Sequence, residues 1–247
     1  TIGAFSGIGG GVVIKPALDT FSTLSVPTIS FLSGCTVLSM TIATLLRSRN
    51  LEIRLEKKTS ILLAFGSILG GLAGTSLFEA LLAVSGNERL VGILQSLLLS
   101  LMVIGVLLFL LVKKHITTKR YTSRILILTI GFFLGTIAAF LGIGGGPINI
   151  VILYIAFSMN SKQAAMNSIY IIFLSQSASL LLTAALGLIP PFQPIILATM
   201  IAGGILGGIT GTFITRRISL HGLDKMFASV LIIILGLSIL NVIQLIG

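Results

Sequence analysis

The sequence predicts an all-α polytopic membrane protein made of two inverted repeats, each with a glycine-broken re-entrant helical hairpin and three transmembrane helices. Three observations predict this fold class: a very apolar composition, a duplicated glycine motif and basic residues confined to short links. Hydrophobic residues make up 55% of the 247 residues and charged residues 9%, and the mean hydropathy is +1.15. Since soluble domains carry roughly 25% charged residues, this composition excludes a water-soluble core and indicates a lipid bilayer as the surroundings.

A glycine motif occurs twice in the chain. Residues 1–11 read TIGAFSGIGGG and residues 136–146 read TIAAFLGIGGG, which are identical at 9 of 11 positions. A second repeated stretch, ILGGLAGT at 68–75 and ILGGITGT at 205–212, has nearly the same separation in sequence as the two copies of the glycine motif. Because duplicated apolar segments broken by glycine are typical of transporters, the repeat points first to that class of membrane protein.

Eight apolar runs divide the chain into two predicted repeats, 1–118 and 119–247, which together form one transport domain. A run of about 20 residues crosses about 30 Å of hydrocarbon at 1.5 Å per residue, so most of the runs suit one crossing each. The first repeat holds runs 1–24, 27–46, 59–84 and 90–112, and the second holds runs 125–159, 164–189, 194–214 and 226–246.

The fifth run, 125–159, is too long for one crossing, because its 35 residues would make a straight helix of about 52 Å. The glycine-rich stretch from Gly142 to Pro147 breaks it near the middle. We expect a re-entrant hairpin with limbs of about 17 residues, and by the repeat a second hairpin in run 1–24. Apolar residues precede the second copy of the motif but not the first, so we expect N-terminal residues to be missing from the sequence.

The basic residues favour two hairpins and six crossings. With every run counted as a crossing, ten basic residues face one side and five the other. With two hairpins, 14 of the 16 gather on one side, in keeping with the positive-inside rule. Link 47–58 then lies opposite its repeat partner 187–194, which gives the halves inverted topology. The links on the basic side are 47–58, 113–124, 159–162 and 216–225. We therefore expect a multi-pass protein of the cell (inner) membrane and no nucleic-acid partner.

The glycine motifs are expected to form the tips of the two hairpins. Glycine lets the backbone turn sharply and brings its N–H groups close to a ligand, and Pro147 suits the start of the helix that follows. A helix N-terminus at mid-membrane would favour an anion, although the carbonyl end of the preceding limb has the opposite sign. The alternative is that the glycines only permit tight packing. The tip residues in question are Gly9, Gly10, Gly11, Gly144, Gly145 and Gly146.

The duplicated G-I-G-G-G signature in a small polytopic protein resembles the TauE/SafE family of sulfite exporters, also called the toluene sulfonate uptake permease family. The likeness covers essentially the whole chain. The resemblance implies transport of a small sulfur-containing anion such as sulfite or an organosulfonate, often outward. The family commonly shows a Gly-Thr-Ser-like stretch after the first segment, which here reads Ser33-Gly34-Cys35-Thr36 and, in the second half, Met166-Asn167-Ser168.

Polar side chains within the apolar runs are candidate contacts for such an oxyanion. Hydroxyl and amide groups can donate hydrogen bonds to it without supplying a full countercharge. Alternatively, small polar residues hold transmembrane helices together, at about 0.6 kcal/mol for each interhelical hydrogen bond. For the cysteine, packing is favoured over a soft contact with sulfur. The candidates are Ser33, Gly34, Cys35, Thr36, Asn149, Asn167, Ser168 and Gln176.

Three ionisable residues lie within or at the end of apolar runs, where charge is costly and often functional. Lys15 follows the first glycine tip and could attract an anion or exchange a proton. Asp19, one helical turn further on, could instead simply neutralise it. Glu79 suits a solvated helix end, with proton coupling as the alternative. Coupled protons or cations therefore remain open as partners.

Two glycine series with small-xxx-small spacing are expected to let helices approach closely. They are Gly66, Gly70 and Gly74 in the first half and Gly203, Gly207 and Gly211 in the second.

An enzyme is disfavoured, because no Cys/His/carboxylate cluster or nucleophile–base spacing stands out, and we expect no metal and no cofactor. The predicted function is a secondary carrier with alternating access. The alternatives are an anion channel and an importer of thiosulfate or another small organic anion.

Overall fold

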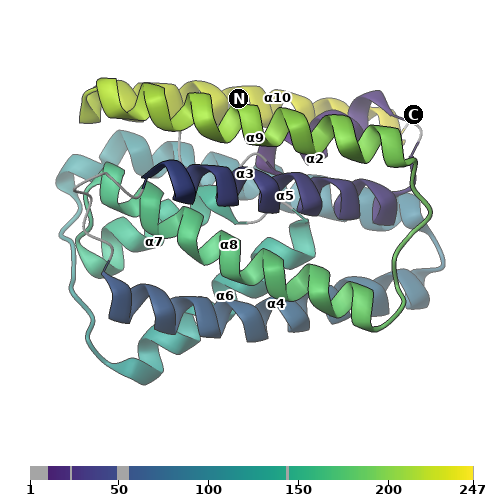
Figure 1. Ribbon diagram of the computed structural model, residues 1–247, viewed down its shortest axis with the longest axis horizontal. Helices are drawn as coiled ribbons and strands as arrows, with labels where there is room; N and C mark the ends of the chain where they lie inside the picture. The colour runs from purple at the N-terminus through teal and green to yellow at the C-terminus, as the bar shows by residue number, and fades with distance from the viewer. Residues whose placement is uncertain (1–10, 23, 49–55, 143–144, 247) are drawn as a thin grey trace.

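A computed structural model describes residues 11–22, 24–48, 56–142 and 145–246 (Figure 1). These residues form nine α-helices, together with the short 3-10 helix η1 (Lys113–His115). The α-helices are α2 (Gly11–Phe21), α3 (Val26–Ser48), α4 (Lys57–Ser85), α5 (Glu88–Val112), α6 (Arg124–Leu141), α7 (Gly146–Phe157), α8 (Ser161–Ala185), α9 (Pro194–Arg217) and α10 (Leu220–Ile246).

Seven of these helices are long and apolar enough to cross a membrane, namely α3, α4, α5, α6, α8, α9 and α10. Large apolar side chains such as Val84, Leu111 and Ile125 are exposed on them, as expected for lipid-facing surfaces. The sequence predicts six crossings, and the seventh candidate span is α6. Of the two limbs predicted at about 17 residues each, α6 has 18 residues and agrees with the prediction, whereas α7 is shorter, with 12.

Local sequence explains where the helices end. Gly86 closes α4 in the left-handed conformation, with φ of 58°. The Asn87 side chain then caps α5 by accepting hydrogen bonds from the backbone N–H groups of Arg89 and Leu90. Helix α8 begins with a capping box, in which Asn160 and Gln163 satisfy each other's backbone N–H groups.

The break between α6 and α7 falls where the sequence predicts it. Gly142 ends α6 with φ of +66° and Gly145 precedes α7 with φ of +71°, conformations that favour glycine. Pro147 lies in the first turn of α7, where its missing N–H removes no helical hydrogen bond. The end of α7 lies beside the chain that leads into α6, since the Lys119 N–H donates to Ile155 O at 2.7 Å and the Tyr121 N–H to Ala156 O at 3.0 Å.

Glycines bring the backbones of α4 and α6 into contact. A Cβ added at Gly66, Gly70 or Gly74 would overlap the α6 carbonyls of Leu128, Phe132 and Thr136, in that order. This contact confirms the close approach predicted for the first glycine series.

In the second glycine series, Gly203 does not make the predicted close helix contact. It is exposed, and a Cβ added there would have no described atom within 4 Å. The contact is made instead by Gly204 and Gly208, against the α3 carbonyls of Thr36 and Met40.

The directions of packed helices follow from matched contacts. The α9 glycines meet α3 in the same chain order, so α3 and α9 run parallel. Helices α4 and α8 also run parallel, since they share contacts at their beginnings, from Ser60 to Asn167, and line one cavity near their ends. Helices α5 and α10 run antiparallel, with Ser96 bonded to Asn241 and Lys113 paired with Asp224.

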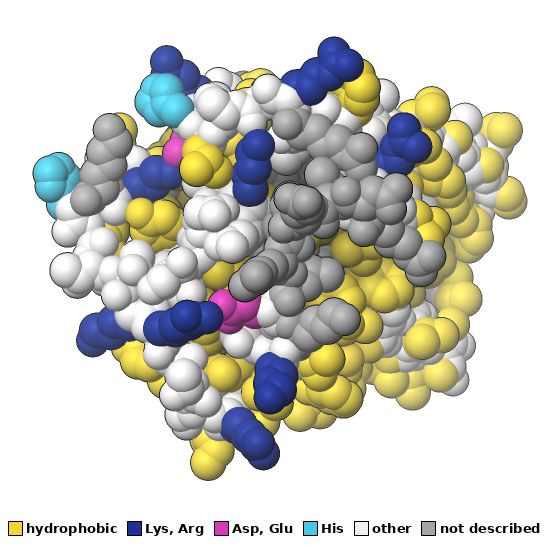
Figure 2. Space-filling view, turned by 60° about the vertical axis from the view of Figure 1, so that its left-hand side comes forward, with side chains coloured by type: hydrophobic (Ala, Val, Ile, Leu, Met, Phe, Trp, Pro, Cys, Tyr) yellow, Lys and Arg dark blue, Asp and Glu magenta, His cyan; other side chains and the backbone are white. Residues whose placement is uncertain are grey.

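Four links meet at one end of the bundle, which carries much of the basic charge (Figure 2). Arg120 pairs with Glu56, at 2.7 Å, and joins two of the links. Lys113 pairs with Asp224, which also accepts a hydrogen bond from Ser161 at 2.9 Å and so joins two more. The described parts of the links predicted on the basic side thus lie together.

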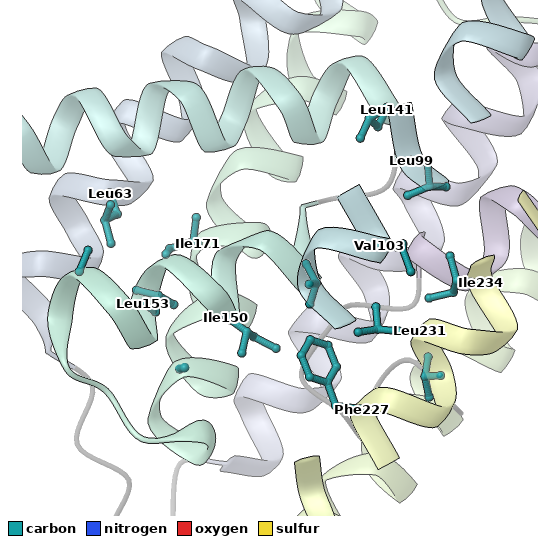
Figure 3. Close-up of a cluster of buried hydrophobic side chains, with 14 of the residues drawn as sticks. Leu63, Leu99, Val103, Leu141, Ile150, Leu153, Ile171, Phe227, Leu231 and Ile234 are labelled. Carbon is teal, nitrogen blue, oxygen red and sulfur yellow. The ribbon is translucent and has the colours of Figure 1, made fainter. Parts of the chain in front are cut away.

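The apolar core surrounds α7. Figure 3 shows Ile150 and Leu153 of this short helix within a buried cluster. Leu63, Val103 and Ile171 supply side chains to the cluster from α4, α5 and α8. Because α7 is covered on its flanks by these helices, its broken N-terminus lies inside protein, as irregular backbone at membrane depth requires.

Candidate functional site

A polar cavity of about 100 Å³ lies among α3, α4, α5, α6 and α8, beside the link that leads into α9. The broken end of α6 contributes Ala138, Ala139 and Gly142 to its wall. Its size suits a small ion with a few waters rather than a bulky apolar substrate. Its polar lining side chains are Ser30, Thr75, Glu79, Gln95, Gln176, Ser179 and Thr183.

The cavity lies toward the end of the bundle opposite the basic links. Pro27 at the start of α3 and Pro190 in the link after α8 line it there. At the basic end, Lys113, Asp224 and Ser161 bind one another and tie α5, α8 and α10 together. This conformation therefore combines a cavity toward one end with packed, ion-paired helices at the other.

Lys15 lies directly behind the cavity wall. Only 3% of the residue is exposed, and its ammonium donates to Asp19 Oδ2 at 3.0 Å and to Gln95 Oε1 at 3.2 Å. Its methylene groups pack against Gly142, where an added Cβ would lie 2.8 Å from Lys15 Cε. The neutralising partner considered for Lys15 is thus present on its own helix, and the lysine also lies beside the glycine that ends α6.

Gln95 connects this lysine to the broken helix. The side chain is buried, accepts from Lys15 and donates through Nε2 to the carbonyl of Phe140 in the last turn of α6. It also lines the cavity, so its amide separates the Lys15 ammonium from the space where an ion would sit. The carbonyl end of α6 has the negative end of the helix dipole, which Lys15 offsets through this amide.

Gln176 and Gly34 form a second part of the wall. Gln176 lines the cavity from α8, and its Nε2 lies 2.5 Å from the position of a Cβ added at Gly34 of α3. The absence of a side chain at Gly34 thus makes room for the Gln176 amide. These two sequence-predicted candidates are brought together at the cavity wall, where the Gln176 side chain carries both hydrogen-bond donors and an acceptor.

Glu79 lines the mouth of the cavity and is exposed, which agrees with the solvated helix end predicted for it. A carboxylate at this position repels anions, although water and salt weaken the effect at an exposed site.

Three other predicted contacts have protein partners or lie apart from the cavity lining. Asn167 accepts a hydrogen bond from Ser60 and donates to Gln163 O at 2.8 Å, so it joins α8 to α4. Thr36 donates to Leu32 O, at 2.8 Å, within its own helix. Cys35 is half-buried on α3.

Two buried serines have hydroxyl groups that form no hydrogen bond with the described residues. Ser33 and Ser168 stand 135 residues apart, the offset of the glycine motif, and each has a buried hydroxyl without a hydrogen-bond partner among the described residues. Asn149 Oδ1 is likewise buried without such a partner, near Gly145 at the start of α7. Unpaired buried polar atoms cost about 1–3 kcal/mol, so these three positions stay candidates for contact with an ion or water.

The tips themselves are described in part. Gly145 and Gly146 are buried at the start of α7, and Gly11 begins α2. The predicted tip residues Gly9, Gly10 and Gly144 lie outside the described residues. Within the described ranges, no group of three His, Cys, Asp or Glu side chains is arranged to hold a metal ion.

Sequence reasoning missed most of the polar wall. Gln95 is an isolated amide in a strongly apolar run, and this was the available signal for it. Ser30, Thr75, Ser179 and Thr183 gave no such signal, because hydroxyls commonly bond to their own helix.

Comparison with known proteins identifies the family. The family model described as Sulfite exporter TauE/SafE matches residues 1–239 and so covers nearly the whole chain. Neither the curated proteins nor the solved structures yield a significant match. Together with seven helices that can cross a membrane, the match makes this a multi-pass membrane transporter and supports a non-enzymatic role. The chain belongs to the TauE/SafE family of sulfite exporters.

Proposed function

We propose that this protein is a secondary carrier that exports a small sulfur-containing anion, such as sulfite or an organosulfonate, across the cell membrane by alternating access. The observation that carries the proposal is the buried Lys15 ammonium, which Gln95 connects to a small polar cavity at the broken end of α6. A buried cation in a membrane domain is costly and marks an ion pathway by default. The family match supports the substrate class.

The two halves are proposed to be inverted repeats. Under the repeat, α3 corresponds to α8, α4 to α9 and α5 to α10. The parallel packing of α3 on α9 then has its counterpart in the parallel packing of α4 on α8. Helices α5 and α10, which correspond to each other, run antiparallel. Antiparallel counterparts are expected when the twofold axis lies in the membrane plane.

The segment α6–α7 is proposed to be a re-entrant hairpin. The hydrogen bonds from Lys119 and Tyr121 to Ile155 and Ala156 hold the entry to α6 beside the exit from α7. Both ends of the segment thus belong to the basic end of the bundle. This arrangement keeps 14 of the 16 basic residues of the sequence on one side.

The conformation is proposed to be open toward the outside. The positive-inside rule assigns the basic end to the cytoplasm, and the cavity lies toward the opposite end. Rocking of one half against the other would separate Lys113 from Asp224 and open the cytoplasmic side. Protons or cations are proposed as coupling partners.

Binding to the purified protein tests this function. Isothermal calorimetry with sulfite and an organosulfonate, beside chloride and acetate, should give saturable heat for the sulfur anions alone. Gln176→Leu replaces the amide by an apolar side chain of similar size. One hydrogen bond to a charged group is worth about 1.5–3 kcal/mol, so the affinity for the sulfur anions should fall roughly tenfold or more. The matched change Gln193→Leu, at an exposed residue before α9, should leave affinity unchanged. Equal response to all four anions would overturn the substrate assignment.

A further inference from the structure

We infer that Asp19 is a built-in substitute for the transported anion: it occupies Lys15 when the carrier is empty and is displaced when substrate binds. The inference rests on the proposed function and adds to it a mechanism for returning the empty site. It follows from the partners of Lys15, the exposure of the two members of the pair and the position of the pair behind the cavity.

The first step is the need for a countercharge. Lys15 is 3% exposed within the helical bundle, and an unpaired buried ammonium costs several kcal/mol. Asp19 supplies the compensating charge from the same helix, one turn further on. The empty carrier is therefore neutral at this site, which lowers the barrier to moving it through the membrane.

The second step is that Asp19 is held incompletely. One carboxylate oxygen, Oδ2, accepts from Lys15 at 3.0 Å, whereas Oδ1 is buried and has no hydrogen-bond partner among the described residues. A carboxylate in a purely structural buried pair is expected to have further donors on its second oxygen. An incoming oxyanion thus replaces one charge-assisted hydrogen bond and disturbs little else.

The third step is the difference in exposure within the pair. The Asp19 side chain is 12% exposed, against 3% for Lys15. When the two separate, the carboxylate can be hydrated, whereas the ammonium needs another anion. The pair can therefore open only when a replacement is present, which links release of Asp19 to arrival of substrate.

The fourth step is the route to Lys15. Gln95 touches both the ammonium and the cavity, and Gly142, which lines the same cavity, packs on the lysine methylenes. Rotation of the Gln95 side chain would bring an anion in the cavity to the ammonium without moving the helices. The same rotation breaks the hydrogen bond from Gln95 to the Phe140 carbonyl, so substrate binding alters the last turn of α6.

The test compares exchange with net transport in liposomes that contain the purified carrier. Exchange is measured as uptake of radiolabelled sulfite into vesicles loaded with unlabelled sulfite, and net transport as efflux into sulfite-free buffer. Exchange needs only the loaded carrier, whereas net efflux needs return of the empty one. Asp19→Asn should therefore keep exchange within about twofold and lower net efflux about tenfold or more, because the empty site would carry an unpaired cation.

Three further variants make the test decisive. Lys15→Met should abolish both fluxes, and the double variant Lys15→Met/Asp19→Asn, which is neutral and so guards against misfolding, should also be inactive while retaining the thermal stability of the wild type. Glu88→Gln removes an exposed carboxylate at the start of α5 and should change neither flux.

Equal loss of exchange and net efflux in Asp19→Asn, or no change in either, would overturn the inference. If the wild-type protein transports no sulfur anion, the proposed function fails instead. In that event the same ratio of exchange to net flux, measured with nitrate as the probe, still tests the substitute role of Asp19.

Discussion

Replacing Gly208 by alanine should destabilise the contact between α9 and α3. A Cβ at this position would lie 2.6 Å from the Met40 carbonyl oxygen, 2.9 Å from Thr44 Oγ1 and 3.1 Å from Ala43 Cβ. Ordinary van der Waals contact needs about 3.4 Å or more, so α9 would have to move away by nearly 1 Å. Overpacking of this kind costs typically about 1–3 kcal/mol, against which alanine regains up to about 1 kcal/mol of helix propensity.

The same helix offers the matched control. Gly203 is exposed, and an added Cβ there meets no described atom within 4 Å. Gly203→Ala therefore gains helix propensity without a steric clash. The free energies of unfolding of Gly203→Ala and Gly208→Ala should differ by about 2 kcal/mol. For a chain of this size that corresponds to roughly 4–8 °C in melting temperature.

Thermal unfolding of the purified variants in one detergent gives the comparison directly. The expected order of melting temperature is Gly203→Ala at or above the wild type and Gly208→Ala clearly below it. Equal melting temperatures for the two variants would refute the backbone contact between α9 and α3, and with it the parallel packing inferred from that contact.

Three more predictions concern the cavity and its closed end. Glu79→Gln removes an exposed negative charge from the mouth, so the half-saturating sulfite concentration in flux assays should fall about twofold to threefold, and an increase would contradict the repulsion argument. Gly34→Ala would push the flexible Gln176 amide out of position and should weaken sulfite binding several-fold in calorimetry with little loss of thermal stability; unchanged binding would remove Gln176 from the site. Lys113→Met leaves Asp224 without its ion-pair partner, and loss of about 1–1.5 kcal/mol should shift the population roughly tenfold toward the cytoplasm-open state. The shift is read as faster labelling, from the basic side, of a cysteine introduced at Ser179 in the cavity wall. Slower labelling would contradict the closing role of the pair.

Hydropathy and glycine spacing predicted most helices because these signals act locally. Run 90–112 became α5 and run 194–214 became the greater part of α9. Helix α10 starts at Leu220, six residues before the predicted run, because a polar turn can continue a helix beyond the hydrocarbon. The unequal limbs of the fifth run could not be predicted, since α7 ends at Phe157 and the next residue, Ser158, has a positive φ and hydrogen bonds to Thr118 and Lys119.

The candidate site was predicted only where a residue was unusual for its surroundings. Lys15 and Gln176 stood out as charged or amide groups in apolar runs, and both lie at the cavity wall or directly behind it. Gln95 meets Lys15 across 80 residues of sequence, a pairing that no local pattern encodes. Asn167 was a favoured candidate from the sequence, but its partner Ser60 comes from another helix, so only tertiary structure distinguishes its role from that of Gln176.

The most direct test of the central claim is sulfite counterflow with wild-type and Lys15→Met protein in liposomes. The proposed carrier should accumulate labelled sulfite transiently against its gradient, with a rate that saturates, and Lys15→Met should accumulate none. Uptake that rises linearly with concentration without transient accumulation, or full activity in Lys15→Met, would contradict a carrier whose anion site is built around this lysine.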